Sequence, residues 1–395
     1  MGKRWRDVIL GVFLGVALAG GVVAYAADVD LGQIVPFRAQ SLWLIKQARA
    51  ILETYYVDAE EPVSEDVLVR GALRGMVSSL GDPYTRFTDP RQLHEEEIEM
   101  QGEYGGLGIY IGQRDGATLV ISPIDGTPAD RAGLKPKDMI VKIGDTYILD
   151  WDQEKVVSHL RGEPGTKVTI WVRREGEDEL LRFDLVREII NIKAVRFEIL
   201  SKDLGYIRLN HFNQKCVAEM REALEKLKAQ KARGLIFDLR NNPGGLLDAA
   251  VDISDMFLDK GIIVGMKGRV PKATDQIFAT GGTLWDKPVV VLINEGSASA
   301  SEIVSGALKD HRRAVVMGAK SFGKGSVQTL FPLQDGSGLY VTIAKYHTPS
   351  GFVIDHVGLS PDIVVEGTMD RELSKDQQLR AAEKELRRIL TVPRP

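Results

Sequence analysis

The stretch Val289-Val-Val-Leu-Ile-Asn-Glu-Gly-Ser-Ala-Ser-Ala-Ser-Glu302 decides the fold of this chain. It opens with an uninterrupted apolar run, which is typical of a strand buried on both faces of a sheet. Small residues follow, and residues 301–309 then have helical composition. A buried strand that leads directly into a helix predicts an α/β layer.

The same alternation continues on both sides of this stretch. We expect strands at residues 206–209, 235–239 and 314–317, and helices at residues 217–230 and 246–257. Two further strands, at residues 327–331 and 340–346, complete a sheet. In the tail, Leu379, Ala382, Leu386 and Ile389 share one helical face, which can cover this core or a second subunit.

Residues 102–190 have a different texture. Short β-branched runs separated by Gly, Pro and Asp predict strands at residues 109–111, 118–122, 167–172 and 182–186, with one helix at residues 153–160. This is a compact β-rich module placed before the α/β core. Residues 40–56 and 65–80 repeat apolar residues at helical spacing, so a small helical region precedes the module.

Composition excludes several classes of function. The 395 residues carry 51 Lys and Arg against 55 Asp and Glu, a net charge of −4, so no basic excess is present for nucleic acid. The one cysteine, Cys216, excludes an intramolecular disulfide framework and a multi-cysteine zinc site, and we interpret it as a small buried side chain. The six His include no HExxH, and His347 with His356 lack a third ligand, so no metal or cofactor is expected.

The N-terminus predicts export. Lys3, Arg4 and Arg6 precede the uncharged run from residue 8 to residue 27, which as a helix would span about 30 Å. Positive charge on its N-terminal side orients such a segment with the N-terminus in the cytoplasm. Cleavage after Ala26 and an uncleaved anchor both remain open, and a buried core helix is the third interpretation.

Three segments could carry chemistry. In residues 294–302 a serine at a helix N-terminus would have backbone donors beside a developing oxyanion, but Ser299 with Glu302 also fits a helix cap. On composition alone Ser297 and Ser301 rival Ser299. In residues 238–245 the Gly-Gly pair offers backbone N–H groups, although Asn-Pro-Gly-Gly also favours a simple turn.

The third segment is residues 318–325. It begins like a phosphate-binding P-loop, but Gly325 stands where Ser or Thr should bind magnesium, and a strand follows instead of a helix. Ser321 and Lys324 also match a β-lactamase-like serine–lysine pair, which needs a helix that the three glycines disfavour. A solvated loop lysine is the simpler interpretation.

Together these motifs resemble the carboxyl-terminal processing peptidases, also called tail-specific proteases. The resemblance rests on Asn-Glu-Gly-Ser-Ala-Ser299-Ala-Ser-Glu, Phe-Gly-Lys324-Gly-Ser-Val-Gln328, Leu239-Arg-Asn-Asn-Pro-Gly-Gly245 and the helical segment from Gly71 to Thr85. It implies that Ser299 is the nucleophile, that Lys324 is its base and that Gln328 orients the lysine. It further implies an oxyanion hole formed by the N–H groups of Ala300 and Gly244.

The β-rich module resembles a PDZ domain. Tyr104-Gly-Gly-Leu-Gly-Ile109 is similar to the carboxylate-binding loop, and Pro128-Ala-Asp-Arg-Ala-Gly-Leu134 to the second signature, while Lys137 replaces a usual glycine. The resemblance implies that the N–H groups of Leu107, Gly108 and Ile109 bind a terminal carboxylate. The helix that carries Val156, Val157 and Leu160 would form the other wall. Arg161 matches an arginine that links substrate binding to the active site.

The sequence therefore predicts a multidomain α/β plus β protein. Its parts are a signal peptide or anchor (1–27), a helical region (28–101), a PDZ domain (102–190), an α/β serine peptidase core (191–367) and a C-terminal helix (368–395). The predicted function is an exported serine endopeptidase that holds apolar C-terminal tails and cleaves through an acyl-enzyme. A homodimer, an activating adaptor and membrane attachment through the first segment are expected. An inactive PDZ adaptor and an acyl-enzyme built on Ser321 and Lys324 are the alternatives.

Overall fold

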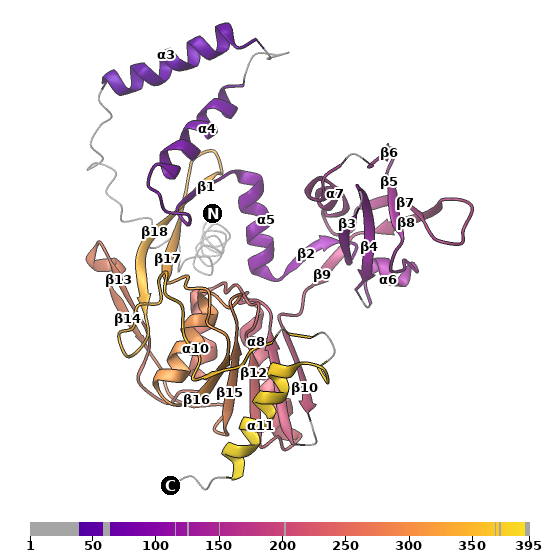
Figure 1. Ribbon diagram of the computed structural model, residues 1–395. Helices are drawn as coiled ribbons and strands as arrows, with labels where there is room; N and C mark the ends of the chain where they lie inside the picture. Colours follow the sequence, from indigo (N-terminus) through magenta and orange to yellow (C-terminus); the bar gives the residue numbers. More distant parts are fainter. Residues whose placement is uncertain are drawn as a thin grey trace, which may run out of the picture. The chain divides into compact units, whose positions relative to one another are not determined.

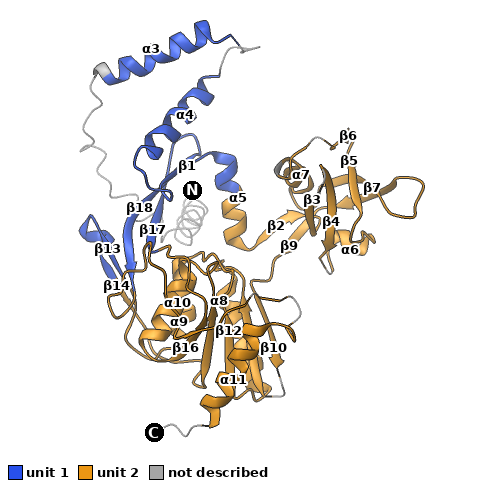
Figure 2. Ribbon diagram, in the orientation of Figure 1, with its two compact units in different colours: residues 1–94, 265–275, 325–347 blue, residues 95–264, 276–324, 348–395 orange. Residues whose placement is uncertain are grey.

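The computed structural model describes residues 39–57, 64–114, 116–124, 126–149, 151–200, 203–367, 369–370 and 373–391. They fall into two compact units (Figure 2). One comprises the described parts of Met1–His94, Gly265–Asp275 and Gly325–His347; the other comprises those of Glu95–Val264, Gln276–Lys324 and Thr348–Pro395. The apolar run at residues 8–27 lies outside the described residues. Within the described ranges, no helix combines the length and apolar character that a bilayer crossing requires.

The core of the second unit is a six-stranded sheet in the order β10-β11-β12-β15-β16-β19. Its strands are β10 (Val195–Leu200), β11 (Leu204–Leu209), β12 (Gly234–Asp238), β15 (Val289–Ile293), β16 (Ala314–Gly318) and β19 (Ile363–Val364). Only the β10–β11 pair is antiparallel; each later pair is parallel. Every residue of β12 and β15 is buried, which explains their continuous apolar sequences. The predicted fold class is confirmed.

Helices cover both faces of this sheet (Figure 1). One face carries α8 (Cys216–Ala229), α9 (Leu247–Asp255) and α10 (Ala300–Asp310), and the other carries α11 (Gln377–Thr391). Leu379, Ala382 and Leu386 of α11 are buried against alternate residues of the strands. The apolar face of the C-terminal helix therefore packs on the core of its own chain, and it offers no support for a dimer.

The β-rich module forms its own sheet, in the order β3-β4-β5-β7-β8 with β6 beside β5. The elements are β3 (Ile109–Arg114), β4 (Ala117–Pro123), α6 (Pro128–Arg131), β5 (Met139–Ile143), β6 (Thr146–Tyr147), α7 (Gln153–Leu160), β7 (Lys167–Arg173) and β8 (Leu181–Val186). A separate ribbon of β2 (Glu103–Gly106) and β9 (Glu188–Asn191) flanks it in sequence. Lys137, the departure from the expected pattern, has a φ of 73°, a conformation that favours glycine.

The remaining strands form a further sheet, in which β18 pairs antiparallel with β1, β13 and β17. It runs β1-β18-β13-β14, with β17 beside β18. Its strands are β1 (Arg86–Thr88), β13 (Ile262–Gly268), β14 (Asp275–Phe278), β17 (Ser326–Pro332) and β18 (Gly338–His347), and the helices α3 (Ala39–Tyr55), α4 (Glu65–Ser78) and α5 (Pro90–Gln101) precede or follow β1 in sequence. The strands expected at residues 327–331 and 340–346 thus pair with each other outside the parallel sheet.

Candidate active site

The three segments with chemical potential follow three neighbouring strands. Residues 239–245 follow β12, residues 294–299 follow β15, and residues 319–325 follow β16. These strands are adjacent and parallel, so their carboxyl ends lie at one edge of the sheet. That edge is where α/β sheets place ligands and reacting groups. Segments that lie far apart in the sequence therefore come together at this edge.

A buried carboxylate joins two of these loops. Glu302, in the first turn of α10, is 1% exposed. It accepts hydrogen bonds from the N–H groups of Ser299 (2.9 Å), Gly323 (2.7 Å) and Lys324 (3.0 Å), and from the Ser321 hydroxyl. Burial raises the pKa of Glu302 above its usual value, and these hydrogen bonds oppose that rise. The sequence suggested only a helix cap at Glu302, but the carboxylate also binds the lysine loop.

Among the three candidate serines, only Ser299 is not fully buried. The hydroxyls of Ser297 and Ser301 donate to the carbonyl oxygens of Leu239 (2.8 Å) and Asn242 (2.9 Å), so both side chains support the loop after β12. Ser299 is half-buried and has φ 54° and ψ −113°. A non-glycine residue in that conformation is strained, and such strain is concentrated at functional sites. These contacts favour Ser299 as the nucleophile.

Gly244 lies against the Ser299 segment. Its φ is 103°, and a Cβ at this position would be 2.9 Å from Ser299 Cβ and 3.0 Å from the backbone nitrogen of Ala300. The close approach therefore requires glycine and places the two expected oxyanion donors next to each other. The Gly244 N–H already donates to Asn242 Oδ1 at 2.9 Å, so an oxyanion would have to displace that bond.

The backbone around Gln328 is less regular than the sequence alternation from Lys324 implied. Strand β17 begins only at Ser326 and has a register shift between Val327 and Gln328, so simple alternation does not run from Lys324 to Gln328. The Gln328 amide donates to Ser326 Oγ (2.8 Å) and Thr342 Oγ1 (3.2 Å). Lys324 and Gln328 belong to different units. An orienting role for Gln328 stays a prediction.

Ser321 is a structural residue. Its hydroxyl donates to Glu302 and accepts from the Leu359 N–H at 2.7 Å, and the residue is buried. No helix forms across residues 319–325, so Ser321 and Lys324 do not share a helix face. Both the β-lactamase-like interpretation and the P-loop interpretation fail on this geometry.

The β-rich module contains a pocket of about 80 Å³. Its walls are formed by Tyr104, Leu107, Gly108, Ile109, Ile111, Val157, Leu160 and Arg161. Four of the five predicted tail-binding residues therefore line it. Val156 does not line it, because its side chain is fully buried in the module's core, and Val157 lines the pocket instead. The Arg161 guanidinium lies over the Tyr104 ring, 4.6 Å from its centroid, and both residues line this pocket.

Comparison with known proteins agrees with this arrangement. Residues 203–365 match the family described as Peptidase family S41, residues 105–185 match the PDZ domain, and residues 29–91 match the activating protease CtpB N-terminal domain. The chain therefore belongs to peptidase family S41 and is a serine-type peptidase with a PDZ domain.

The chain is also similar to individual proteins that are described as C-terminal processing proteases. A carboxy-terminal-processing protease of Bartonella bacilliformis is 42% identical over 341 residues, covering 85% of this chain and 77% of the relative. A carboxyl-terminal-processing protease of Synechocystis sp. is 38% identical, with 84% and 76% covered. A solved structure described as a photosystem II D1 C-terminal processing protease is 30% identical in sequence and superposes with a TM-score of 0.52. The match covers 88% of this chain and 98% of that chain. The predicted family is confirmed.

Proposed function

We propose that this protein is an exported endopeptidase that holds the C-terminal tails of proteins in its PDZ domain and cleaves them with Ser299 and Lys324. The observation that carries the proposal is the Glu302 carboxylate, which binds the backbone N–H groups of both residues. This shared tether joins the serine loop to the lysine loop. The names of the relatives, which are C-terminal processing proteases, support a tail-directed activity.

The proposed reaction has two halves. The neutral amine of Lys324 takes the proton from Ser299 Oγ, and Oγ forms a bond to the scissile carbonyl carbon. The N–H groups of Ala300 and Gly244 stabilise the oxyanion. The C–N bond then breaks, Lys324 returns the proton to the leaving amine, and an ester to Ser299 remains. Water gives a proton to Lys324 and attacks the ester carbon; the bond from that carbon to Ser299 Oγ then breaks, Lys324 returns the proton to Oγ, and the acid is released. No cofactor enters the scheme.

The PDZ pocket supports recognition of an apolar tail. Leu107, Ile111, Val157 and Leu160 supply apolar walls, and the loop at residues 107–109 supplies the backbone of the predicted carboxylate site. Arg161 couples the pocket to the peptidase core in this proposal. The residues at 8–27 would export the chain and retain it at the membrane unless they are cleaved. Exposed apolar side chains on α3 and α4, among them Trp43, Leu44 and Val67, support a homodimer or an adaptor contact.

Two serine variants test the proposal. Ser299→Ala should abolish cleavage of a peptide with an apolar C-terminus. Folded Ser321→Ala should retain most of it, because the Ser321 hydroxyl has structural contacts, to Glu302 and to the Leu359 N–H. Mass spectrometry of the wild type with an active ester should show an acyl group on Ser299.

At pH values where chemistry limits the rate, kcat/KM should rise with pH as Lys324 loses its proton. Retained cleavage by purified Ser299→Ala would refute the mechanism, and an inactive wild type that still binds tails would favour the adaptor.

A further inference from the structure

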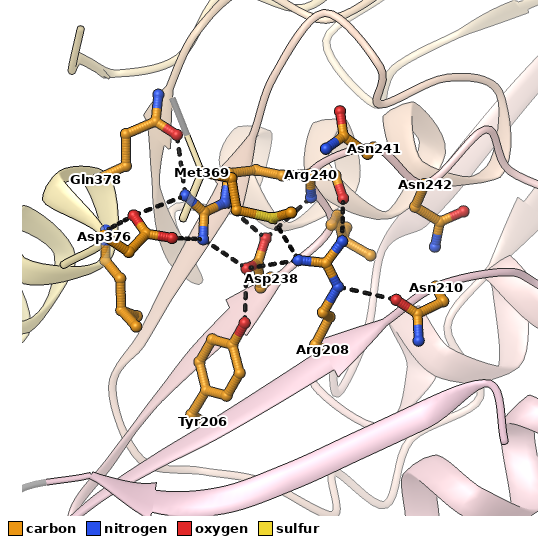
Figure 3. Close-up of polar contacts among 12 residues, drawn as sticks. Tyr206, Arg208, Asn210, Asp238, Arg240, Asn241, Asn242, Met369, Asp376 and Gln378 are labelled. Atoms are coloured by element: carbon orange, nitrogen blue, oxygen red, sulfur yellow. Dashed lines mark hydrogen bonds and ion pairs between the residues drawn. The ribbon is translucent and has the colours of Figure 1, made fainter. Parts of the chain in front are cut away.

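A buried charged cluster surrounds Arg240, which lies in the loop after β12 (Figure 3). At its centre is Arg240, whose side chain is 0% exposed, as are those of Asp238 and Asp376. Its guanidinium donates to Asp238 at 2.9 and 2.7 Å and to Asp376 at 3.0 and 2.8 Å. Gln378 Oε1 accepts a further bond at 3.0 Å. Nothing in the proposed reaction uses this cluster.

Asp376 and Gln378 come from the far end of the chain. Asp376 lies 136 residues after Arg240, directly before α11, and its Oδ1 also accepts from the Leu379 N–H at 2.9 Å. Asp376 and Gln378, at the start of the C-terminal helix, therefore accept three of the five hydrogen bonds from a guanidinium that belongs to the loop after β12. Burial works against the charge on Arg240, but the two carboxylates outweigh it and raise the pKa of the guanidinium. A buried charge that loses one partner is strongly penalised, so this geometry tolerates little displacement.

Hydrogen bonds connect the residues on both sides of Arg240 to the segment that carries Ser299. Two residues after Arg240, the buried Asn242 offers its backbone carbonyl to the Ala298 N–H (3.0 Å) and to Ser301 Oγ (2.9 Å). The Asn242 side chain holds the Gly244 N–H. Leu239, on the other side of Arg240, binds Ser297 Oγ. A shift of Arg240 would therefore move Gly244 and the residues on either side of Ser299 together.

We propose that Asp376 is a positioning residue for the peptidase reaction: through Arg240, the C-terminal helix fixes residues 239–245 and so places Gly244 beside Ser299. This inference rests on the proposed function. It makes the C-terminal helix part of the apparatus that sets the oxyanion geometry, in addition to its role as a cover for the sheet. Because the tail pocket is formed by other residues, loss of Asp376 should act on kcat and leave KM nearly unchanged.

The test compares Asp376→Asn with Leu386→Ala in the full chain. Leu386 is a buried residue of the same helix that packs against Gly234, at the start of β12, and its side chain cannot hydrogen-bond to Arg240, so its truncation loosens the helix without removing a polar partner of the guanidinium. At a temperature where both variants are folded, Asp376→Asn should lower kcat roughly 10- to 100-fold with KM unchanged, and Leu386→Ala should stay near wild type. Asp376→Glu should recover part of the loss. Equal kcat in the two variants would overturn the proposal.

Hydrogen exchange gives a readout that does not depend on cleavage. Asp376→Asn should speed exchange of the amides at residues 239–245 and 297–301, whereas Leu386→Ala should speed exchange mainly in α11. Unchanged exchange in the two loops would refute the coupling even in an active enzyme, and faster exchange in a chain that never cleaves would uphold the coupling and refute the proposed function. If Asp376→Asn does not fold, Gln378→Met removes one acceptor from Arg240 and should produce the same loop pattern more weakly.

Discussion

Removal of the Glu302 carboxylate should uncouple the serine loop from the lysine loop. In Glu302→Ala three backbone N–H groups and the Ser321 hydroxyl lose their acceptor. Each buried donor left unpaired costs about 1–3 kcal/mol, partly offset by the burial cost of a carboxylate that is no longer present. The larger effect falls on geometry, because Ser299 and Lys324 no longer share a tether. A displacement of about 1 Å lowers a rate by roughly 100-fold, and we expect a loss of kcat of that order.

Glu302→Gln should lower kcat much less than Glu302→Ala, because the amide can still bind most of the same groups. If the amide oxygen takes the place of Oε2, it still accepts from the Ser299 and Lys324 N–H groups, and the amide NH2 donates to Ser321 Oγ. The Gly323 N–H loses its partner, at about 1–3 kcal/mol, and the Ser321 hydroxyl hydrogen must turn to another acceptor. The opposite orientation leaves two N–H groups unpaired, so the first is favoured. We expect Glu302→Gln to keep activity within about tenfold of wild type.

Steady-state cleavage of a tail-bearing peptide, combined with urea unfolding, checks both variants. Ser305→Ala is the matched control: Ser305 lies on the same helix and is fully buried, and its hydroxyl has no hydrogen-bond partner among the described residues, so its loss should change neither activity nor stability appreciably. A folded Glu302→Ala with wild-type kcat would refute the tether. So would a Glu302→Gln as inactive as Glu302→Ala, because the orientation argument would then have failed.

Three further outcomes follow from single residues. Lys137→Gly should stabilise the β-rich module by up to about 1 kcal/mol, since Lys137 has a positive φ; a lower melting temperature would contradict this. Val157→Ala should weaken tail binding, measured by fluorescence titration, with little effect on stability. Val156→Ala should instead destabilise the folded module by about 1–2 kcal/mol, because Val156 is buried in its core. The reverse pattern would exclude the pocket assignment. Burial raises the pKa of Cys216 to about 12, so iodoacetamide at pH 8 should modify this thiol only after the protein unfolds. Mass spectrometry measures the modification, and rapid labelling of the native protein would show that the thiol is not buried.

Much of the fold was predictable because its signals are local. The expected strand at residues 289–293 coincides with β15, and the helix at residues 153–160 coincides with α7. Continuous apolar runs predicted buried parallel strands, and such strands bring their carboxyl ends to one edge. The meeting of the loops that carry Gly244, Ser299 and Lys324 thus follows from sequence pattern together with sheet geometry.

What escaped prediction depends on contacts between distant residues or on backbone irregularity. Glu302 fits a helix cap by its spacing, and nothing local shows that Gly323 and Lys324 also donate to it. The partnership of Arg240 with Asp376 spans 136 residues and has no periodicity to reveal it. For Gln328, a register shift that the sequence does not show cancelled the alternation argument.

The strained backbone at Ser299 explains why so many of these contacts point at one segment. A positive φ at a residue with a side chain costs about 1–2 kcal/mol and would relax in an isolated loop. Here the neighbours on both sides are fixed from outside: Ala298 and Ser301 bind Asn242, the Ser297 carbonyl accepts from the Phe322 N–H at 3.0 Å, and Glu302 holds Ser299 itself. The strain is therefore maintained by the loops after β12 and β16 jointly. It follows that the reactive conformation belongs to the assembled sheet edge, and that substitutions in either flanking loop should affect catalysis without touching the hydroxyl.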